Sequence, residues 1–497
     1  MKYISTRGNH EAVSASKAIV LGMVPEGGLF VPESIPQMSE DEFTALIGKS
    51  YQEIAEVVLG KYLTDYTKED ITECVNGAYN AHSFDHIDIV PLAKLDDKHY
   101  ILELWHGPTA AFKDLALQLT PRLLVKGMQH LDMQKKVAIL VATSGDTGKA
   151  ALEGFKDVDN TEIIVFYPAY GVSKVQALQM KTTSGKNTHV VAVEGNFDDC
   201  QSAVKDIFAS AEMNKWVEEH GYEFSSANSI NWGRLLPQIV FYVASYLNLV
   251  RDCAIKYGDK VDYVVPTGNF GNILAAWYAK QMGLPIGRLV CASNTNKVLT
   301  DFFQSGVYDR RREFFQTNSP SMDILISSNL ERFLFEITNH NGEKVAKWMD
   351  ELKKDGIFTV DEATKAQMDR YIIAGFADEK ATVETIAKVF KADKYLLDTH
   401  TAVGVKVCAD NAGANVAVID ATASPFKFVK SVYEAIEGES GEIEELELLD
   451  KLEALSGEAV HRGLNALDKK EILHHRLCKK EEIAAQVKEI LGEACTK

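Results

Sequence analysis

The most regular pattern along the chain is a short, continuously apolar run, followed by a turn and then by apolar residues at helical spacing. Strands of this kind, when they alternate with helices, indicate a parallel sheet that is buried on both faces. The pattern therefore predicts a doubly wound α/β fold, in which ligand-binding loops lie at the carboxyl ends of the strands. The runs that predict strands are Lys136–Ala142, 162–167, 189–193, 262–265, 288–292, 395–398 and 415–420.

Several helix boundaries can also be predicted from local signals. A helix is expected to start near Ser173, and Asp198 or Asp199 is expected to cap the helix that follows residues 194–196. Gly283 is placed where it would end the helix that follows residues 268–272.

The composition divides the chain into three parts. Residues 1–90 are expected to form an N-terminal domain of helices and turns. Residues 91–430 carry the strand–turn–helix units, with a smaller α/β subdomain at about 135–220 inserted in the larger one and a polar, helical segment at 340–394. Residues 431–497 form an acidic extension that is expected to be helical, with solvated faces that cap a domain.

The net charge and the cysteine pattern exclude several kinds of protein. The 497 residues include 53 basic and 71 acidic side chains, a formal net charge of −18, which argues against nucleic acid or an anionic membrane as the main partner. The seven cysteines are scattered and form no C-x-x-C pair, as expected for a reduced, cytoplasmic chain without a disulfide framework or a zinc site. No stretch approaches the ~20 apolar residues of a membrane-spanning helix.

A lysine follows a Gly-Pro turn in the segment LWHGPTAAFKD at 104–114. Lys113 is predicted to lie in the first turn of a helix, beside Phe112. A lysine in an apolar setting near the positive end of a helix loses proton affinity, and its free amine can attack a carbonyl carbon. The alternative is an ordinary surface lysine, which spacing alone favours. His106 is interpreted as a loop or packing residue rather than a catalytic base.

Two glycine-rich turns follow predicted strands. The turn SGDTG at 144–148 exposes backbone N–H groups at a helix start and suits a carboxylate or phosphate, although a simple tight turn is an equal alternative. It matches neither the dinucleotide fingerprint nor the P-loop. The turn GNFGN at 268–272 combines two glycines with two asparagines and predicts a nest of N–H donors. Together they favour a phosphorylated ligand that carries a second anionic group.

Two further segments carry candidate binding groups. In SSANSINWGR at 225–234, hydroxyl and amide groups surround Arg234, whose guanidinium can make a two-pronged contact with phosphate. The equal alternative is an N-capped helix with Arg234 on its surface. Thr422, in ATASPFKF at 421–428, follows the last predicted strand where that strand would open into a site, a position usually held by an ordinary turn residue.

In this order, these segments resemble the longer form of the threonine synthase family, whose members depend on pyridoxal phosphate (PLP). The resemblance covers about residues 1–430 and the acidic tail least. It departs at Trp105 and the Ala110–Ala111 pair, and at Ser424, where a histidine is common before Pro425. The motifs that carry the resemblance are HGPTAAFKD, ATSGDTG, EGNFDDCQ, NSINWGR, PTGNFGN, SPSMDI, DTHTAVG and TASPFKF.

The resemblance implies a fold-type-II PLP enzyme of the tryptophan-synthase β kind. Two doubly wound domains with parallel or mixed sheets would enclose the site, with helical additions at both ends of the chain. Lys113 matches the lysine that carries PLP, and Thr422 matches the hydroxyl residue near the pyridine nitrogen. The loop for the cofactor phosphate matches Gly268, Asn269, Phe270, Gly271 and Asn272.

The resemblance also implies where the substrate binds, and it implies no metal. The loop that receives the substrate carboxylate matches Thr143, Ser144, Asp146 and Thr147. The region that grips the substrate phosphate matches Ser226, Asn228, Ser229, Asn231 and Arg234.

The implied activity is the conversion of O-phospho-L-homoserine and water to L-threonine and phosphate, the last step of threonine biosynthesis. Alternatives are a PLP-dependent phospho-lyase acting on O-phosphothreonine, a serine/threonine dehydratase, and a non-catalytic binding protein on the same scaffold. The dehydratase needs no phosphate grip, so NSINWGR counts against it, whereas the phospho-lyase would use almost the same groups. A cytoplasmic monomer or homodimer with a small-molecule substrate is expected.

Overall fold

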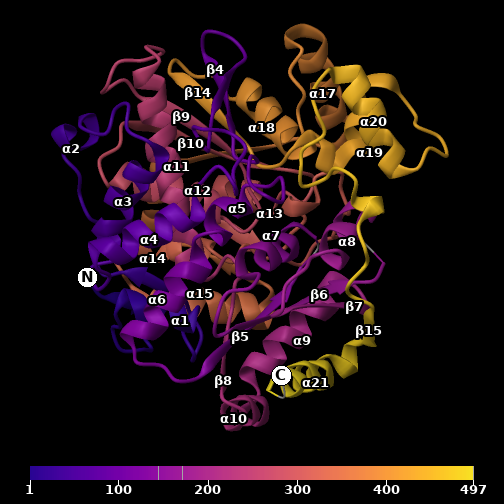
Figure 1. The fold of residues 1–497 in the computed structure, drawn as a ribbon. Helices are drawn as coiled ribbons and strands as arrows, with labels where there is room; N and C mark the ends of the chain where they lie inside the picture. Colours follow the sequence, from indigo (N-terminus) through magenta and orange to yellow (C-terminus); the bar gives the residue numbers. More distant parts are fainter. Residues whose placement is uncertain (144, 171, 496–497) are drawn as a thin grey trace.

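Two sheets form the frame of the protein (Figure 1). The computed structural model describes residues 1–143, 145–170 and 172–495. The larger sheet is parallel except for β3, which pairs antiparallel with β4, and the smaller sheet is parallel throughout. The larger sheet has the order β13 (Ile372–Phe376), β10 (Ile286–Ser293), β9 (Val261–Pro266), β14 (Val416–Ala421), β4 (His99–Glu103) and β3 (Leu92–Lys94). The smaller sheet has the order β15 (Arg476–Lys479), β7 (Thr188–Glu194), β6 (Thr161–Pro168), β5 (Lys136–Ala142) and β8 (Tyr222–Ser225).

Helices cover both sheets and build the N-terminal region. That region contains the hairpin of β1 (Tyr3–Ser5) and β2 (Phe30–Pro32) with α1 (Ala15–Leu21), α2 (Glu40–Thr44), α3 (Tyr51–Tyr62) and α4 (Lys68–Ala78). Around the smaller sheet are α7 (Asp146–Phe155), α8 (Lys174–Lys181), α9 (Phe197–Ala209) and α10 (Ala211–Glu219).

The other helices that precede the C-terminal extension are α5 (Lys113–Leu117), α6 (Thr120–His130), α11 (Trp232–Arg251), α12 (Gly271–Gln281), α13 (Val298–Ser305), α14 (Leu330–Ile337), α15 (Gly342–Asp355), α16 (Glu362–Tyr371), α17 (Glu379–Asp393) and α18 (Thr399–Asp410). A second hairpin joins β11 (Val307–Asp309) to β12 (Ile357–Thr359). The C-terminal helices are α19 (Val429–Glu437), α20 (Glu445–Ser456) and α21 (Ile483–Cys495).

Most of the predicted strands and helix boundaries are confirmed. Six of the seven apolar runs form β5, β6, β7, β9, β10 and β14. Ser173 caps α8, and α12 ends directly before Met282 and Gly283. The cap of α9 was predicted wrongly, because Asn196 accepts the hydrogen bond from the Asp199 N–H while Asp199 completes the capping box.

One predicted strand and one segment predicted to be helical differ from the structure for tertiary reasons. Residues 395–398 form no strand; they lead into α18, and Asp398 caps that helix. The edge of the larger sheet is instead β13, which lies inside the segment expected to be helical and directly follows α16. A short apolar run without a turn signal before it reads as the end of a helix, and only pairing with β10 makes it a strand.

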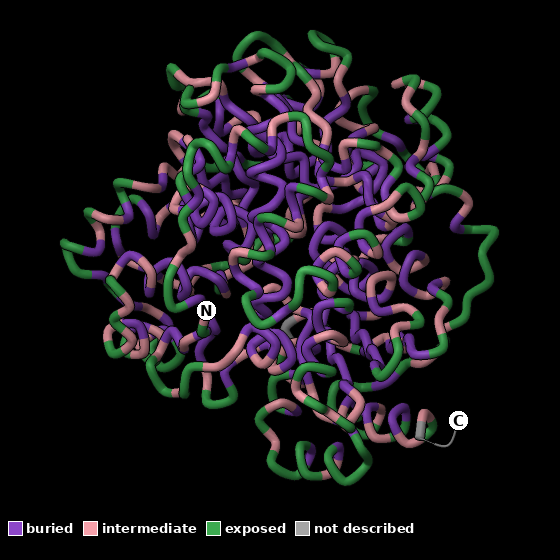
Figure 2. Tube along the Cα trace, turned by 60° about the vertical axis from the view of Figure 1, so that its left-hand side comes forward, coloured by how far each residue is buried: buried purple, intermediate pink, exposed green. Residues whose placement is uncertain are grey.

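The interior is continuous across the larger sheet and the N-terminal region (Figure 2). Helix α11 runs through it, and nearly all of its residues are buried. The N-terminal region is attached to α14 by Thr6 and Arg7, which both bind the Glu331 carboxylate. This places the NSINWGR segment, at the start of α11, deep between the N-terminal region and the two sheets.

The C-terminal extension differs from the expected helical cap because it also supplies β15. The yellow chain in Figure 1 descends from α20 along one side of the molecule to β15 and α21. On the way, the Gly463 carbonyl accepts a hydrogen bond from Gln179 of α8, and a Cβ at Gly463 would lie 2.2 Å from the Pro108 carbonyl oxygen. The extension therefore contacts the turn before Lys113 and completes the smaller sheet.

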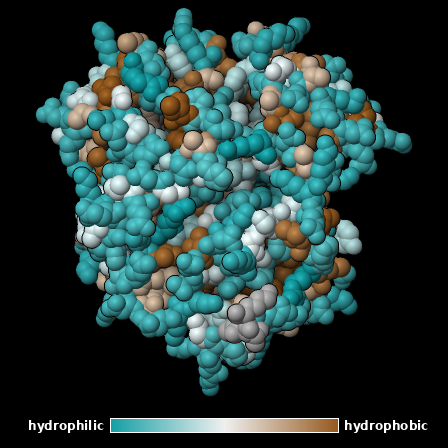
Figure 3. All heavy atoms as spheres, viewed as in Figure 1, coloured by the Kyte–Doolittle hydropathy of each residue, from teal (hydrophilic) through white to brown (hydrophobic). Residues whose placement is uncertain are grey.

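The outer surface is largely hydrophilic on the face that Figure 3 shows, with apolar residues in scattered patches. Among the described helices, none combines the length and the apolar character that crossing a membrane requires.

Helix α7 approaches α5 so closely that only glycine fits at position 154. A Cβ there would lie 1.9 Å from the backbone oxygen of Leu117, the last residue of α5. We expect Gly154→Ala to lower the free energy of unfolding by about 1–3 kcal/mol, the usual cost of overpacking. Urea denaturation measures this value.

Gly492 in α21 is the matched control, because a Cβ there meets no atom within 4 Å. We expect Gly492→Ala to raise the free energy of unfolding by up to about 1 kcal/mol, since alanine favours a helix. Equal stability of the two variants would contradict the close approach of α7 to α5.

Candidate active site

Lys113 lies where two distant segments run side by side. The Phe112 N–H donates to the Thr422 carbonyl at 2.9 Å, and the Ser424 N–H donates to the Ala110 carbonyl at 3.0 Å. These backbone bonds join the turn that precedes α5 to the chain that leaves β14. They bring Thr422 next to the residue that precedes Lys113.

The amine of Lys113 is buried in a charged setting. Its Nζ lies 3.2 Å from Asp146 Oδ2 and 3.4 Å from Ser321 Oγ. Burial lowers the pKa of Lys113; the charges of Lys427 and Arg234 act in the same direction, and Asp146 opposes them. The surface-lysine alternative is therefore excluded, and the free amine is more accessible at neutral pH than in an exposed lysine.

The Asp146 carboxylate accepts contacts from four side chains. Besides Lys113, it is bound by Ser321 Oγ at 3.0 Å, Gln176 Nε2 at 2.9 Å and Lys427 Nζ at 3.0 Å. Burial alone would raise the pKa of Asp146, but the two ammonium groups and Gln176 hold it well below its usual range. The Asp146 side chain is thus an ionised carboxylate whose two oxygens are both bound by protein groups. We therefore expect the backbone N–H groups of this turn, rather than the Asp146 side chain, to bind a substrate carboxylate.

The SGDTG turn is folded by Thr143. The Thr143 hydroxyl accepts hydrogen bonds from Gly145 N at 3.0 Å and Gly148 N at 2.9 Å, so this side chain shapes the start of α7. Thr147 is partly exposed in the first turn of α7. The predicted substrate residue Ser144 lies outside the described residues.

The GNFGN turn leaves the start of α12 available to an anion. Phe270 occupies the left-handed region at φ 61° and precedes α12 without any side-chain capping bond. The first N–H groups of a helix lack partners within the helix and carry its positive end. Gly268 is required by a close approach, because a Cβ there would lie 2.7 Å from the Ser321 carbonyl oxygen. The turn is held from below by Asn329, whose backbone and amide nitrogens both donate to the Asn269 carbonyl at 3.0 Å.

Asn272 contributes its backbone position rather than its side chain. Its amide oxygen accepts from the Tyr242 hydroxyl at 2.7 Å, and its amide nitrogen donates to Asp420 at 3.1 Å. Both polar atoms of the side chain therefore point into the protein, below the turn.

Arg234 is buried without a counter-charge among the described residues. One nitrogen, Nη1, donates to the Ala227 carbonyl at 2.8 Å, while Nε has no partner among those residues. Burial lowers its pKa to about 10. A buried, uncompensated guanidinium is costly unless an anion pairs with it.

Arg332 shows what a structural arginine looks like in the same region. It is equally buried, but its Nε, Nη1 and Nη2 donate to the Phe30 carbonyl, the Asn329 side chain and the Ile230 carbonyl. Every nitrogen of Arg332 is satisfied by the fold. In Arg234, by contrast, Nε has no hydrogen-bond partner among the described residues and can still bind a ligand.

The polar side chains near Arg234 form hydrogen bonds that fix the loop before α11. Asn231 caps α11 through Gly233 N and donates both amide hydrogens, to Ile19 O and Ser226 O, so its side chain positions the loop. The Ser226 hydroxyl accepts from the Asn228 N–H at 3.2 Å. The Ser229 hydroxyl lies 3.3 Å from Ser328 Oγ, next to the Asn329 that supports the GNFGN turn.

Four site residues escaped the sequence analysis: Gln176, Ser321, His400 and Lys427. Ser321 and His400 lie in SPSMDI and DTHTAVG, motifs that were recognised without any role. The Ser321 N–H donates to His400 Nε2 at 3.1 Å, while His400 Nδ1 lies 2.9 Å from Asp398. Lys427 is part of TASPFKF and has a fully buried side chain. Gln176 carries no local signal, because only the fold of α8 brings it to Asp146.

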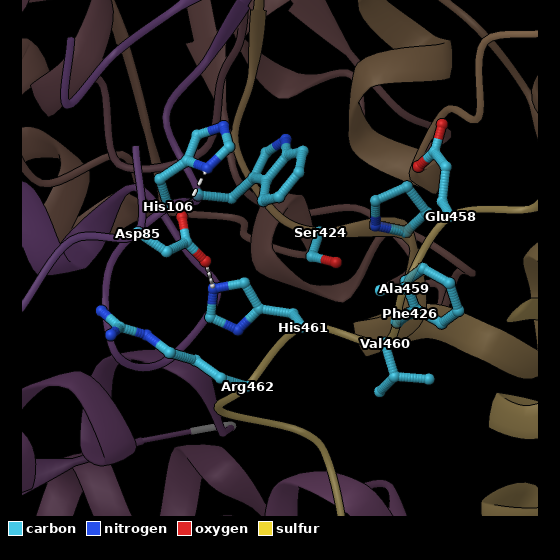
Figure 4. A pocket seen from close by; sticks show the side chains of 11 residues that line it. Asp85, His106, Ser424, Phe426, Glu458, Ala459, Val460, His461 and Arg462 are labelled. Carbon is cyan, nitrogen blue, oxygen red and sulfur yellow. Dashed lines mark hydrogen bonds and ion pairs between the residues drawn. The ribbon is translucent and has the colours of Figure 1, made fainter. Parts of the chain in front are cut away.

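A histidine–carboxylate cluster supports the turn before Lys113 from outside. Asp85 lies between His106 and His461, at 2.7 Å and 3.3 Å, as Figure 4 shows. His106 also contacts Glu103 at 2.9 Å; burial lowers its pKa, but the two carboxylates outweigh this and raise it. The cluster borders a cavity of about 320 Å³ and joins the C-terminal extension to the HGPT turn. No three metal-binding side chains are arranged to hold an ion within the described residues.

Two family models match the chain. One, described as "Threonine synthase N terminus", matches residues 2–79, and another, described as "Pyridoxal-phosphate dependent enzyme", matches residues 84–418. The threonine synthase of Pseudomonas aeruginosa is 38% identical over 88% of this chain and 91% of its own length. Threonine synthase-like 1 of Homo sapiens is 40% identical over 85% of this chain, and the chain spans 58% of the length of that relative.

Solved structures agree with this relationship. The PLP-bound threonine synthase from Brucella melitensis superposes with a TM-score of 0.88 at 37% identity and covers 100% of both chains. The yeast threonine synthase gives a TM-score of 0.87 at 32% identity over 99% of each chain. Two helix-covered sheets with a buried lysine at a helix start, together with the second family model, define a PLP-dependent enzyme. The chain belongs to the threonine synthase family of these enzymes.

The residues present fit the PLP cofactor of this family. PLP requires a reactive amine and a phosphate site, and the chain offers the buried Lys113 and the uncapped start of α12. Both are tied to one scaffold: Ser321 contacts Lys113 and packs on Gly268.

The buried charge cluster predicts a pH-dependent stability. Lys427→Met should lower the free energy of unfolding by about 3–5 kcal/mol at neutral pH, because it removes one partner of a buried ion pair. The pKa of Asp146 lies below its unfolded value of about 3.9, so its contribution is present above that pH and lost as the pH falls. The difference between wild type and variant should therefore shrink on acidification, measured by urea denaturation at several pH values.

Lys430→Met is the matched control, because that lysine is exposed and its Nζ lies 4.0 Å from Glu434 Oε1. Its stability should equal that of the wild type at every pH. A destabilisation by Lys427→Met that does not vary with pH would contradict an ionised Asp146.

Proposed function

We propose that the chain is a threonine synthase that converts O-phospho-L-homoserine and water to L-threonine and phosphate with PLP. The observation that carries this proposal is Arg234, a buried guanidinium without a described anionic partner, whose charge reaches Lys113. A phosphorylated amino acid would bring the missing anion to a position beside the reactive lysine.

Three groups of the chain would hold PLP: Lys113, the backbone N–H groups at 268–271, and Thr422. When bound, PLP supplies a delocalised electron system that stabilises negative charge at the α-carbon of an amino acid. The start of α12 would neutralise the cofactor phosphate. The N–H groups at the start of α7 would orient the substrate carboxylate in the same way, with Thr143 keeping that turn in shape.

Lys113 is the residue that moves protons in this proposal. Burial lowers its pKa, so at neutral pH its Nζ can accept a proton from the α-carbon and return it later. Asp146 retains its ion pair with Lys427 in either state of Lys113. A proton can therefore leave Lys113 while the Asp146 carboxylate stays paired with Lys427. An unpaired carboxylate would be costly at this depth.

The alternatives differ in what they require of the site. A dehydratase of serine or threonine has no use for a buried arginine that lacks a counter-charge. A phospho-lyase acting on O-phosphothreonine would use the same lysine and arginine, and the product of the reaction separates it from the synthase.

We further propose that the enzyme works in the cytoplasm as a monomer or homodimer. Six cysteines of the described residues are free, and five of these are buried, in keeping with a reducing compartment.

Purified protein with PLP and O-phosphohomoserine tests the proposed activity. We expect release of phosphate together with threonine, identified by chromatography and mass spectrometry. Lys113→Ala should lose all turnover while circular dichroism shows an intact fold, because the proton-carrying amine is gone. A 2-oxo acid as the product would replace the synthase by a lyase, and an inert wild-type enzyme would overturn both.

Arg234→Met tests the phosphate grip. Loss of two charge-assisted hydrogen bonds of about 1.5 kcal/mol each should lower kcat/KM for the phosphorylated substrate by about 10²-fold. The affinity for an unphosphorylated amino acid, measured by the change in PLP absorbance, should change little.

Arg251→Met is the matched control, because Arg251 is partly exposed and pairs with Asp88 and Asp252. Its kinetics should resemble those of the wild type. Equal losses for phosphorylated and unphosphorylated ligands in Arg234→Met would place the phosphate grip elsewhere.

A further inference from the structure

Three side chains form a closed triangle beneath the GNFGN turn. Asp420, at the carboxyl end of β14, is fully buried, and its Oδ2 lies 2.7 Å from the Tyr242 hydroxyl of α11. The same hydroxyl lies 2.7 Å from Asn272 Oδ1, in the first turn of α12. Asn272 Nδ2 closes the triangle at 3.1 Å from Asp420 Oδ2.

Each side of the triangle needs one hydrogen, because two oxygen acceptors at 2.7 Å repel unless a proton lies between them. Tyr242 supplies one hydrogen and the Asn272 amide nitrogen supplies another. If Asp420 is ionised, it supplies none. The single tyrosine hydrogen would then have to serve both Asn272 and Asp420, although each contact has the length of a complete O–H···O bond.

Turning the Asn272 amide over does not remove the deficit. Its nitrogen would then donate to Tyr242, and Tyr242 could donate to Asp420. The amide oxygen would, however, face an ionised Asp420 oxygen with no hydrogen between them. In both orientations a proton on Asp420 completes all three bonds.

We propose that Asp420 is a positioning residue that carries a proton in the working enzyme and closes a ring of three hydrogen bonds with Tyr242 and Asn272. The ring fixes the first turn of α12, and with it the N–H groups that receive the PLP phosphate. A neutral acid does this without placing a negative charge beside that phosphate. The proposal concerns the cofactor loop and holds whichever phosphorylated amino acid is the substrate.

The surroundings of Asp420 favour the neutral form. Its Oδ1 has no partner among the described residues, which costs far less for a neutral acid than for a carboxylate. Burial raises the pKa of Asp420 to about 7, although the bonds from Tyr242 and Asn272 lower it.

The ionisable groups that face Asp420 are tyrosines. Tyr242 comes from α11 and Tyr263 from β9, and burial raises the pKa of each, so both stay neutral. Strand β4 presents Leu102 as the register partner of Asp420. Helix α18 packs on the other face of β14, where Gly404 meets Ile419. No cation within ion-pair distance of Asp420 is found in the part of the chain that the structure describes.

Ionisation should loosen the cofactor loop. Above about pH 7 the ring loses a hydrogen, and the new charge repels the phosphate. We expect the dissociation constant for PLP to rise from about pH 6 to about pH 8.5 by about tenfold more in the wild type than in Asp420→Asn. The ionisations of PLP and Lys113 contribute equally to both proteins, so the difference isolates Asp420.

Infrared spectroscopy of the protein without cofactor tests the proton directly. The carbonyl band of a protonated carboxylic acid should be stronger in the wild type than in Asp420→Asn at about pH 6. The difference spectrum separates Asp420 from other buried acids such as Asp114, whose pKa is also raised by burial. The folded pKa of Asp420 exceeds its unfolded value of about 3.9. Its stabilising contribution is therefore full below about pH 3.9 and is lost as the pH rises from there through about 7.

The melting temperature of the wild type should therefore fall relative to that of Asp420→Asn as the pH rises from about 4 to about 7.

Tyr242→Phe provides a second variant that keeps Asp420 in place. It removes the acceptor of the acid proton, so the acid band should remain at about pH 6 and shift in frequency. An unchanged band would refute the ring. Absence of an acid band from the difference spectrum of wild type and Asp420→Asn, or parallel pH profiles of PLP binding in the two proteins, would refute the proton on Asp420.

Discussion

Asp146 is buried together with the ammonium groups of two lysines, and a carboxylate at this depth is costly unless charged or hydrogen-bonding groups surround it. The members come from separate parts of the chain. Lys113 starts α5, Lys427 follows β14, and Ser321 lies in the segment that packs on Gly268. The carboxylate therefore joins the two sheets beside Lys113, the residue proposed to carry the cofactor.

The C-terminal extension strengthens the same connection from outside. It crosses from α20 to the smaller sheet, meets Pro108 through Gly463, and ends by adding β15 to β7. His461 and Asp85 fix its middle part to the turn before Lys113. The extension, whose sequence predicts a solvated acidic tail, is thus a structural link between the turn before Lys113 and the smaller sheet.

The net charge of −18 and the anionic ligands are compatible because the two act at different depths. The positive groups of the site are few and buried: Lys113, Lys427, Arg234 and the starts of two helices. A charge in such surroundings is screened far less than one on the surface, so a few donors outweigh the acidic exterior. The proton assigned to Asp420 follows the same logic, since it keeps a further negative charge out of this region.

The sequence by itself determined the elements whose signals are local. Six apolar runs became strands, Ser173 became a cap, and Lys113 lies at a helix start, because periodicity and capping act within a few residues. The motifs also identified the family, and they predict one site that contains Lys113, the GNFGN turn and Thr422. Tertiary structure alone decided the rest: β13 and β15 became strands only by pairing with β10 and β7. The burial of Arg234, the ion pairs of Asp146 and the ring around Asp420 depend on desolvation by residues hundreds of positions away, and no local pattern records that environment.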